Sequence, residues 1–383
     1  SIKLNLGYFP HREYEPMEYW GVKDVYDVTY LPVLPNSPLK SQKQNQSVGP
    51  MQLRKNSLLN FVENEGFDLN LIDYSNEYQN SQAYSSKFNM HMNSVLSFLK
   101  SRFPKNSRIT EIGCGQGHFV EMLQHDGYFK VKGYDASYEG SNASIEKRYL
   151  DDQDRLDTDL IVLRHVLEHV KNPYSFLNTL KQIFSKAKIY IEVPNYDWII
   201  ENQTFFDITY EHVNYFSQES LQALYEDTRK IHGLTFDDQY QYIIADIHKL
   251  NLKFNEYYNK DNWEKLSFNE LFPNMKNDII RLDKIGENRN IFLWGAATKG
   301  CLFLAHCKNQ DRLIDRVLFA IDQNPQKVGK FMPGSLTPIK SKQDLFATAN
   351  SGDLLIIANE AYKKEIEEEI IKAKMPELII ETL

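Results

Sequence analysis

The amino-acid sequence predicts an α/β protein built on a doubly wound parallel sheet, with a second, smaller domain of the same kind near its C-terminal end. Apolar strand-like runs alternate with helical segments from residue 108 to residue 193, and the strand-then-turn pattern resumes after residue 288. That alternation is typical of parallel sheets with helices on both faces. A length of 383 residues is also too great for one ordinary core. We therefore expect two α/β domains in one chain.

The chain divides into four expected segments. Residues 1–75 contain proline turns and polar stretches, which predict an irregular N-terminal lobe. Residues 76–248 are expected to form the first α/β domain, 249–287 a polar helical connector, and 288–383 the smaller C-terminal domain. Both α/β domains are expected to be Rossmann-like, with ligands at the carboxyl ends of their strands.

Four strands are expected in the first domain, at Arg108–Ile112, Lys130–Asp135, Leu160–Arg164 and Ile189–Val193. A helix is expected before them over Phe88–Leu99, where apolar residues recur three and four apart. Another helix is expected over Leu221–Tyr225, and the run Phe236–His248 is expected to supply two strand-like segments that close the sheet.

A glycine-rich turn follows the first strand and predicts a nucleoside site. Its glycines, Gly113, Gly115 and Gly117, let a ligand approach the backbone closely. Glu111 precedes them, and a carboxylate there disfavours a pyrophosphate but suits the ammonium and sulfonium of S-adenosylmethionine (SAM). Asp135 ends the next strand about twenty residues later, where a ribose diol needs a carboxylate acceptor. The alternative is a purely structural strand-to-helix turn.

With these features the chain resembles the class I SAM-dependent methyltransferases. The likeness extends through DLIVLRHVLEHVKNP and IYIEVPN. Two more segments, YEHVNYFS and WGAATKG, are similar to the sugar C-methyltransferases, which act on nucleotide-linked deoxy-ketosugars. The resemblance runs from roughly Asp73 to the end of the chain. It implies SAM as cofactor and a nucleotide-linked sugar as the small-molecule substrate.

The resemblance implies a catalytic group around His212. A carbon acceptor beside a ketone must lose a proton before it is methylated, and histidine suits that step because its pKa lies near neutrality. The family places its catalytic histidine at the position of His212. Glu211 would orient the imidazole or hold a sugar hydroxyl, Tyr210 would donate to the enolate oxygen, and Tyr84 would reach the sugar. The alternative for His212 and Tyr84 is packing.

Further residues are expected to bind the cofactor or the substrate. Arg164 and His165, just past the third strand of the domain, are expected beside SAM, whereas His169 is expected to pack. The substrate is expected to contact residues at strand ends of both domains, namely Asn195, Gly295, Ala296, Lys299, Asp322 and Asn324. Of these, Lys299 offers a point charge for a diphosphate at a helix N-terminus, and the alternative for its turn is close helix-strand packing.

No metal is expected. Sugar C-methyltransferases usually begin with a zinc-binding lobe held by two cysteine pairs, but this chain has no cysteine before Cys114, and His11 alone cannot form a tetrahedral site. His165 and His169 lie four residues apart, as in some metal sites, but they lack the metalloprotease pattern because Val166 stands where a glutamate is needed.

Composition excludes several classes of function. A net charge of −8 argues against a general nucleic-acid binder. No run approaches the length of a membrane span, and the first residues lack a signal-peptide pattern, so we expect a cytoplasmic protein with reduced thiols. The oligomeric state is not determined by the sequence.

The function expected from these features is SAM-dependent C-methylation of a nucleotide-activated deoxy-ketosugar. One alternative is O- or N-methylation of a sugar or another biosynthetic intermediate. A non-catalytic nucleotide-binding scaffold is an alternative from another class. An NAD-dependent oxidoreductase is disfavoured by the glycine spacing and by Glu111.

Overall fold

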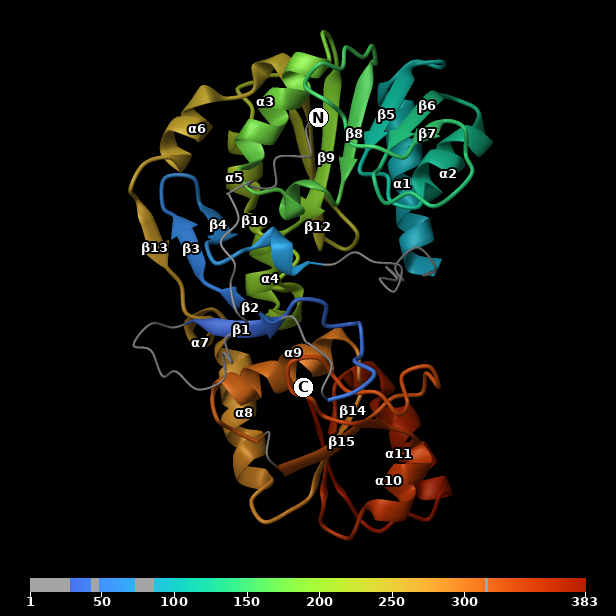
Figure 1. Cartoon of the computed structure of the whole chain (residues 1–383), viewed down its shortest axis with the longest axis vertical. Coiled ribbons are helices and arrows are strands. Elements are labelled where there is room, and N and C mark those ends of the chain that lie inside the picture. The colour runs from blue at the N-terminus through green and yellow to red at the C-terminus, as the bar shows by residue number, and fades with distance from the viewer. Residues whose placement is uncertain (1–27, 43–47, 73–85, 314–315) are drawn as a thin grey trace.

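The computed structural model describes residues 28–42, 48–72, 86–313 and 316–383. Tyr84 lies outside the described residues, as does His11. The described part consists of two α/β bodies joined end to end, with the strands β1 and β2 at their junction (Figure 1). Within the described ranges, no helix is long and apolar enough to cross a membrane.

A seven-stranded sheet forms the first body, in the order β11-β12-β9-β8-β5-β6-β7. Neighbours from β9 to β7 are parallel, whereas β12 is antiparallel to both β9 and β11. The strands are β5 (Arg108–Ile112), β6 (Lys130–Tyr134), β7 (Ile145–Glu146), β8 (Leu160–Arg164), β9 (Lys188–Pro194), β11 (Ile231–Thr235) and β12 (Tyr240–Asp246). The four expected parallel strands are confirmed. The closing hairpin starts earlier than expected, because the run from Phe236 supplies only its turn and second strand.

Helices cover both faces of this sheet. On one face, apolar side chains of α1 and α2 pack against Ile109, Leu160 and Val162. On the other face, the alternate strand residues Ile161 and Leu163 pack against α3, α5 and α6, as the period of two in a strand requires. The helices are α1 (Ser86–Arg102), α2 (His118–Asp126), α3 (Pro173–Ile183), α4 (Tyr196–Glu201), α5 (Gln218–Ala223) and α6 (Leu252–Tyr258).

Strands from distant parts of the chain form a second, four-stranded sheet in the order β10-β4-β3-β13. Its strands are antiparallel, and β1 and β2 form a separate antiparallel pair. The bounds are β1 (Thr29–Pro32), β2 (Val48–Met51), β3 (Leu53–Asn56), β4 (Phe61–Asn64), β10 (Asn214–Phe216) and β13 (Trp263–Lys265). Strands β4 and β3 of the N-terminal region therefore pair with β10, which precedes α5 in the sequence, and with β13, which follows α6.

The second body is a smaller, wholly parallel five-stranded sheet in the order β16-β15-β14-β17-β18. This confirms the expected second Rossmann-like domain. Its strands are β14 (Ile291–Trp294), β15 (Val317–Ile321), β16 (Ile339–Lys340), β17 (Leu354–Ile357) and β18 (Ile379–Thr382). The helices of this half are α7 (Phe268–Leu271), α8 (Pro273–Ile285), α9 (Thr298–Asn309), α10 (Lys342–Thr348) and α11 (Lys363–Lys372).

One hydrophobic core crosses the junction between the two bodies. It includes Leu31 and Met51 of the N-terminal region, Phe205 from the segment after β9, and Phe303 of α9. Asn309 of α9 also exchanges two hydrogen bonds with the backbone of β1. The first domain, the N-terminal strands and the C-terminal domain are thus held together by packed apolar side chains.

Candidate active site

The glycine-rich turn combines two packing glycines with one that faces open space. A Cβ on Gly113 would lie 2.5 Å from a methyl carbon of Val166, and one on Gly117 would lie 2.4 Å from a methyl carbon of Ile145. A Cβ on Gly115 would meet no atom within 4 Å. All three glycines have positive φ, so side chains there are strained in any case. Gly113 and Gly117 therefore shape the turn, and Gly115 faces the space where a ligand fits.

Asp135 fixes this turn from the end of β6. One carboxylate oxygen accepts a hydrogen bond from the Gly115 amide at 2.7 Å, and the other accepts from the amide and hydroxyl of Ser137. A carboxylate has about four lone-pair positions, so further acceptor capacity remains for a ribose diol. The structure thus places Asp135 and Gly115 together, as expected.

Glu111 is a buried carboxylate beneath the turn. Only 3% of the residue is exposed, and its Oε2 has no hydrogen-bond partner among the described residues. Burial raises the pKa of Glu111 to about 7, although the nearby Arg164 guanidinium, 3.7 Å away, opposes the rise. The Arg164 guanidinium lies over the Phe119 ring of α2. A cationic group placed beside the unpartnered Oε2 would favour the ionised carboxylate.

A second buried carboxylate, Glu192 of β9, gathers polar groups around it. His91 of α1 contacts it at 2.9 Å, and the Tyr190 hydroxyl donates to it at 2.6 Å. Arg164 lies 3.8 Å away, and His165 Nε2 lies 3.1 Å away. Burial opposes ionisation, but the close contact with His165 and the hydrogen bond with His91 hold the pKa of Glu192 well below its usual range. Glu192 is therefore an anion that connects α1 with the ends of β8 and β9.

His165 is held as a cation between two carboxylates. Its φ is 53°, an uncommon conformation for a residue other than glycine, and its ring reaches both Glu168 and Glu192. Burial favours the neutral imidazole, but the contacts with Glu168 and Glu192 outweigh it and raise the pKa of His165 to about 9. The same contact with His165 lowers the pKa of Glu168 in spite of burial.

His212 lies near Glu168 and beside His169. The two imidazole rings are 4.8 Å apart and nearly perpendicular, and His169 Nδ1 donates to the Glu211 carbonyl oxygen at 2.8 Å. The Nδ1 atom of His212 is buried without a hydrogen-bond partner among the described residues. Burial and the neighbouring His169 lower the pKa of His212 to about 3, so its imidazole is neutral. His169 was expected to pack, but its ring is part of this cluster.

Glu168, His169 and His212 are also the residue types that bind metals. Their potential ligand atoms lie within 4.8 Å of one another in the described part of the chain. His169 Nδ1 is committed to the Glu211 carbonyl, which leaves Nε2 as its available nitrogen. The same arrangement suits proton transfer, because it sets a neutral imidazole beside an ionised carboxylate.

Tyr210 is not brought to this cluster. It is fully buried, its hydroxyl accepts from the Asp68 amide at 2.8 Å, and its ring stacks on Phe67 and fills the space over Gly49. The expected donation to an enolate is contradicted by this position, because the hydroxyl serves the N-terminal region. Tyr84 lies outside the described residues.

Gly295, Ala296 and Lys299 of the expected substrate residues lie where β14 passes into α9, but Lys299 is bound elsewhere. Lys299 Nζ donates to the Leu383 carbonyl and lies over the Phe206 ring. Lys327 instead reaches the turn and donates to the Ala296 carbonyl at 3.0 Å. A Cβ on Gly300 would lie 2.1 Å from the Gly295 carbonyl oxygen, so close helix-strand packing explains that glycine.

The remaining expected substrate residues hold neighbouring loops. The Asp322 carboxylate accepts from the Asn324 amide and lies 3.6 Å from Lys327. Asn195, at the end of β9, donates to the Asp238 carbonyl, and its Oδ1 has no partner among the described residues. Asn195 therefore connects β9 to the β11–β12 turn.

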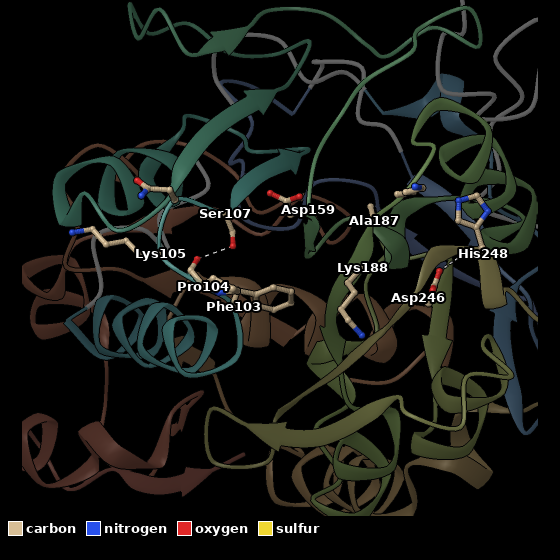
Figure 2. Close-up of a pocket in the computed structure, with 11 residues that line it drawn as sticks. Phe103, Pro104, Lys105, Ser107, Asp159, Ala187, Lys188, Asp246 and His248 are labelled. Atoms are coloured by element: carbon tan, nitrogen blue, oxygen red, sulfur yellow. Dashed lines mark hydrogen bonds between the residues drawn. The ribbon is translucent and has the colours of Figure 1, made fainter.

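The structure also contains an open pocket of about 710 Å³ (Figure 2). Its lining includes Ser107, Asp159 and Lys188, which lie at or just before the first residues of β5, β8 and β9. It therefore lies at the amino ends of the parallel strands. Because ligands of such sheets bind at the carboxyl ends, we do not assign the active site to it.

Comparison with known proteins decides the family. Residues 59–228 match the family model of a methyltransferase domain, and residues 249–376 match that of a C-methyltransferase C-terminal domain. The protein is a SAM-dependent methyltransferase with a C-methyltransferase C-terminal domain. A search of curated protein sequences gave no match.

Solved structures of other methyltransferases are similar to part of the enzyme. A SAM-dependent methyltransferase from Archaeoglobus fulgidus is 16% identical, with 43% of this chain and 96% of that chain covered and a TM-score of 0.34. One from Aquifex aeolicus is 17% identical, with 41% and 89% covered and a TM-score of 0.31. The plantazolicin methyltransferase BpumL, in complex with SAH, is 16% identical, with 43% and 85% covered and a TM-score of 0.31.

The residues of the first domain fit SAM. Gly115 faces open space, Asp135 retains acceptor capacity, and the buried Glu111 Oε2 lacks a partner among the described residues. Glu111 would hold the ammonium of the cofactor, and Asp135 its ribose. When bound, SAM supplies an electrophilic methyl group.

Several residues of the site were missed from the sequence. His91 and Glu192 were not expected there. A charged residue inside the apolar run IYIEVPN was a usable signal for Glu192, and a histidine on the apolar face of α1 was one for His91.

Proposed function

We propose that the enzyme C-methylates a nucleotide-activated deoxy-ketosugar, with His212 as the base. The observation that carries this proposal is the buried Nδ1 of His212, which has no hydrogen-bond partner among the described residues. A neutral imidazole can accept a proton, and its low pKa in the free enzyme follows from burial and from His169. The charge of Glu168 favours the imidazolium that proton transfer creates. The enolate formed beside it would favour the imidazolium further.

The proton would come from the carbon beside the ketone of the sugar. As the base removes it, the electron pair of the C–H bond forms a carbon–carbon double bond and the ketone becomes an enolate. His169 stands 4.8 Å from His212, and its Nδ1 is fixed by the Glu211 carbonyl, so this pair keeps a constant orientation. Exclusion of water by the buried surroundings would protect the enolate from reprotonation.

The nucleoside diphosphate would lie against the C-terminal domain. The helix α9 begins at Thr298 without a side-chain cap, so its first backbone N–H groups suit an anion. The Gly295 and Ala296 turn precedes it, and Lys327 brings an ammonium group to the same turn. Asp322 and Asn324 would shape the neighbouring loop, whereas Lys299 would first have to leave the Leu383 carbonyl. The family model for this domain, a C-methyltransferase C-terminal domain, supports a carbon acceptor.

The test is proton exchange before methyl transfer. We expect the wild-type enzyme with SAH, in D₂O, to exchange the hydrogen beside the ketone of a thymidine diphosphate-linked 4-keto-6-deoxyhexose. His212→Ala should keep SAM affinity and lose both exchange and methylation. Methylation by the wild-type enzyme without any exchange would instead favour an O- or N-acceptor, and unchanged turnover in His212→Ala would remove the assigned role.

A metal-dependent reaction is distinguished by chelation. Because we assign Glu168, His169 and His212 to proton transfer, we expect full activity after dialysis against EDTA, and metal analysis should find less than stoichiometric zinc. Activity lost with EDTA and restored by one divalent metal would contradict the proton-transfer assignment.

A further inference from the structure

Tyr240 begins β12 at the carboxyl edge of the seven-stranded sheet. It is paired with Pro194 at the end of β9, so it belongs to the same edge as the glycine-rich turn. Its half-buried ring lies edge-on to His165 at 4.5 Å and stacks flat on Phe236 at 4.7 Å. His91 of α1 lies 5.6 Å away. Among the described residues, no hydrogen bond to the Tyr240 hydroxyl is present.

The turn before Tyr240 is strained. Phe236, Asp237 and Asp238 all have positive φ, between 54° and 63°. That conformation is uncommon for residues other than glycine, and least favourable for the bulky Phe236. It is held in place because Asn195 donates a hydrogen bond to the Asp238 carbonyl. Strain kept by such anchors is often found at functional sites. Within this turn the Phe236 ring lies flat against Tyr240.

The charges around Tyr240 keep its hydroxyl protonated. Burial raises the pKa of Tyr240, and the carboxylates Glu192, Asp207 and Glu168 raise it further. The group is therefore a hydrogen-bond donor at any working pH. Beside it stands the His165 imidazolium, whose charge is maintained by its own two carboxylate contacts.

Tyr240 and His212 share the charged neighbour Glu168. Asp207 interacts electrostatically with both Tyr240 and Tyr215, and Tyr215 lies next to the His212 ring at 6.4 Å. Glu168 connects the two histidines, because it contacts His165 and lies in the cluster with His212. The base His212 and the neutral donor Tyr240 are thus both associated with this carboxylate, the first through the histidine cluster and the second through His165.

We propose that Tyr240 is a further catalytic residue, whose hydroxyl donates a hydrogen bond to the substrate carbonyl oxygen as that oxygen gains negative charge. This rests on the proposed function. The proton passes from the carbon to His212, and the carbonyl electron pair moves onto oxygen, where Tyr240 and the His165 cation meet it. The carbonyl then reforms as the carbon makes its new bond to the methyl group, and the methyl–sulfur bond breaks to leave SAH. Tyr240 thus takes the role that the sequence suggested for Tyr210.

The test compares two conservative variants on one strand. Tyr240→Phe removes only the hydroxyl, whereas Tyr242→Phe is the matched control, because Tyr242 lies two residues along β12 on the same face and packs on Tyr190 and Phe98. Loss of one oxyanion donor typically lowers kcat about 10²- to 10³-fold. With the thymidine diphosphate-linked 4-keto-6-deoxyhexose, we expect that loss in Tyr240→Phe for both methylation and deuterium exchange, with SAM affinity unchanged. Tyr242→Phe should behave as wild type.

The outcomes separate this inference from the function on which it rests. If Tyr240→Phe retains exchange and methylation within twofold while His212→Ala loses both, the role of Tyr240 is refuted and the proposed function stands. If the wild-type enzyme methylates the probe without exchange, the enolate and both roles fail together. Equal losses in Tyr240→Phe and Tyr242→Phe would show a packing effect and would also overturn the inference.

Discussion

Replacing Glu111 by glutamine should make the free enzyme more stable at pH 8 and weaken its hold on SAM. Burial raises the pKa of Glu111 from 4.5 to about 7. A shift of one unit corresponds to about 1.36 kcal/mol, so ionisation of this carboxylate costs the folded state about 3 kcal/mol at pH 8. Because the pKa of Glu111 is higher in the folded than in the unfolded state, the stabilisation from its protonated carboxyl is complete below pH 4.5 and is lost as pH rises through about 7. Glutamine is neutral and avoids that loss.

The measurement is urea unfolding of both proteins without ligand at pH 5 and pH 8. We expect Glu111→Gln to exceed wild type by up to about 3 kcal/mol at pH 8 and to differ much less at pH 5. Calorimetry should show SAM binding weakened roughly 10- to 100-fold, since a charge-assisted hydrogen bond is worth about 1.5–3 kcal/mol. The exposed Glu226→Gln is the control and should change neither quantity. Equal stability of wild type and Glu111→Gln at pH 8, or undiminished SAM affinity, would refute the reasoning.

Three further substitutions separate packing from binding. Gly115→Val should abolish SAM binding, measured by calorimetry, because its side chain fills the open space beside the turn. Its free energy of unfolding should fall by only about 1 kcal/mol, because the positive φ is strained for a residue with a side chain. Gly300→Ala should lower stability by roughly 1–3 kcal/mol in urea, because its Cβ would collide with the Gly295 carbonyl; wild-type stability would contradict this. Tyr210→Phe should cost roughly 1 kcal/mol through the lost bond to the Asp68 amide but keep kcat, and a large loss of kcat would return Tyr210 to the site.

The sequence predicted those parts of the fold that depend on local pattern. The strands Arg108–Ile112 and Leu160–Arg164 occur with the expected bounds, because continuous apolar runs bounded by turns define buried parallel strands. The glycine-rich turn and Asp135 were found because their spacing along the chain fixes their positions in space. The closing hairpin was misplaced by several residues, since Ile231–Thr235 carries a glycine and a histidine that weaken its strand pattern.

The parts of the site that depend on contacts between distant residues were not predictable. Tyr210 and His212 are two residues apart, yet one packs against the N-terminal region and the other lies beside His169. Spacing along a loop does not determine which way its side chains turn. The polar group around Glu192 likewise joins α1, β8 and β9, and only the fold shows that these ends meet.

The four-stranded sheet has a consequence for biosynthesis. Asn56 of β3 pairs with Trp263 of β13, and Asn56 and Asn262 are 206 positions apart. At roughly 5–20 residues per second, a ribosome needs roughly 10–40 s to make the intervening chain. Until then the outer edge of β3 lacks its partner strand β13, and exposed strand edges invite pairing with other chains. Nascent polypeptides of this enzyme should therefore depend on chaperone protection more than either α/β body alone would suggest.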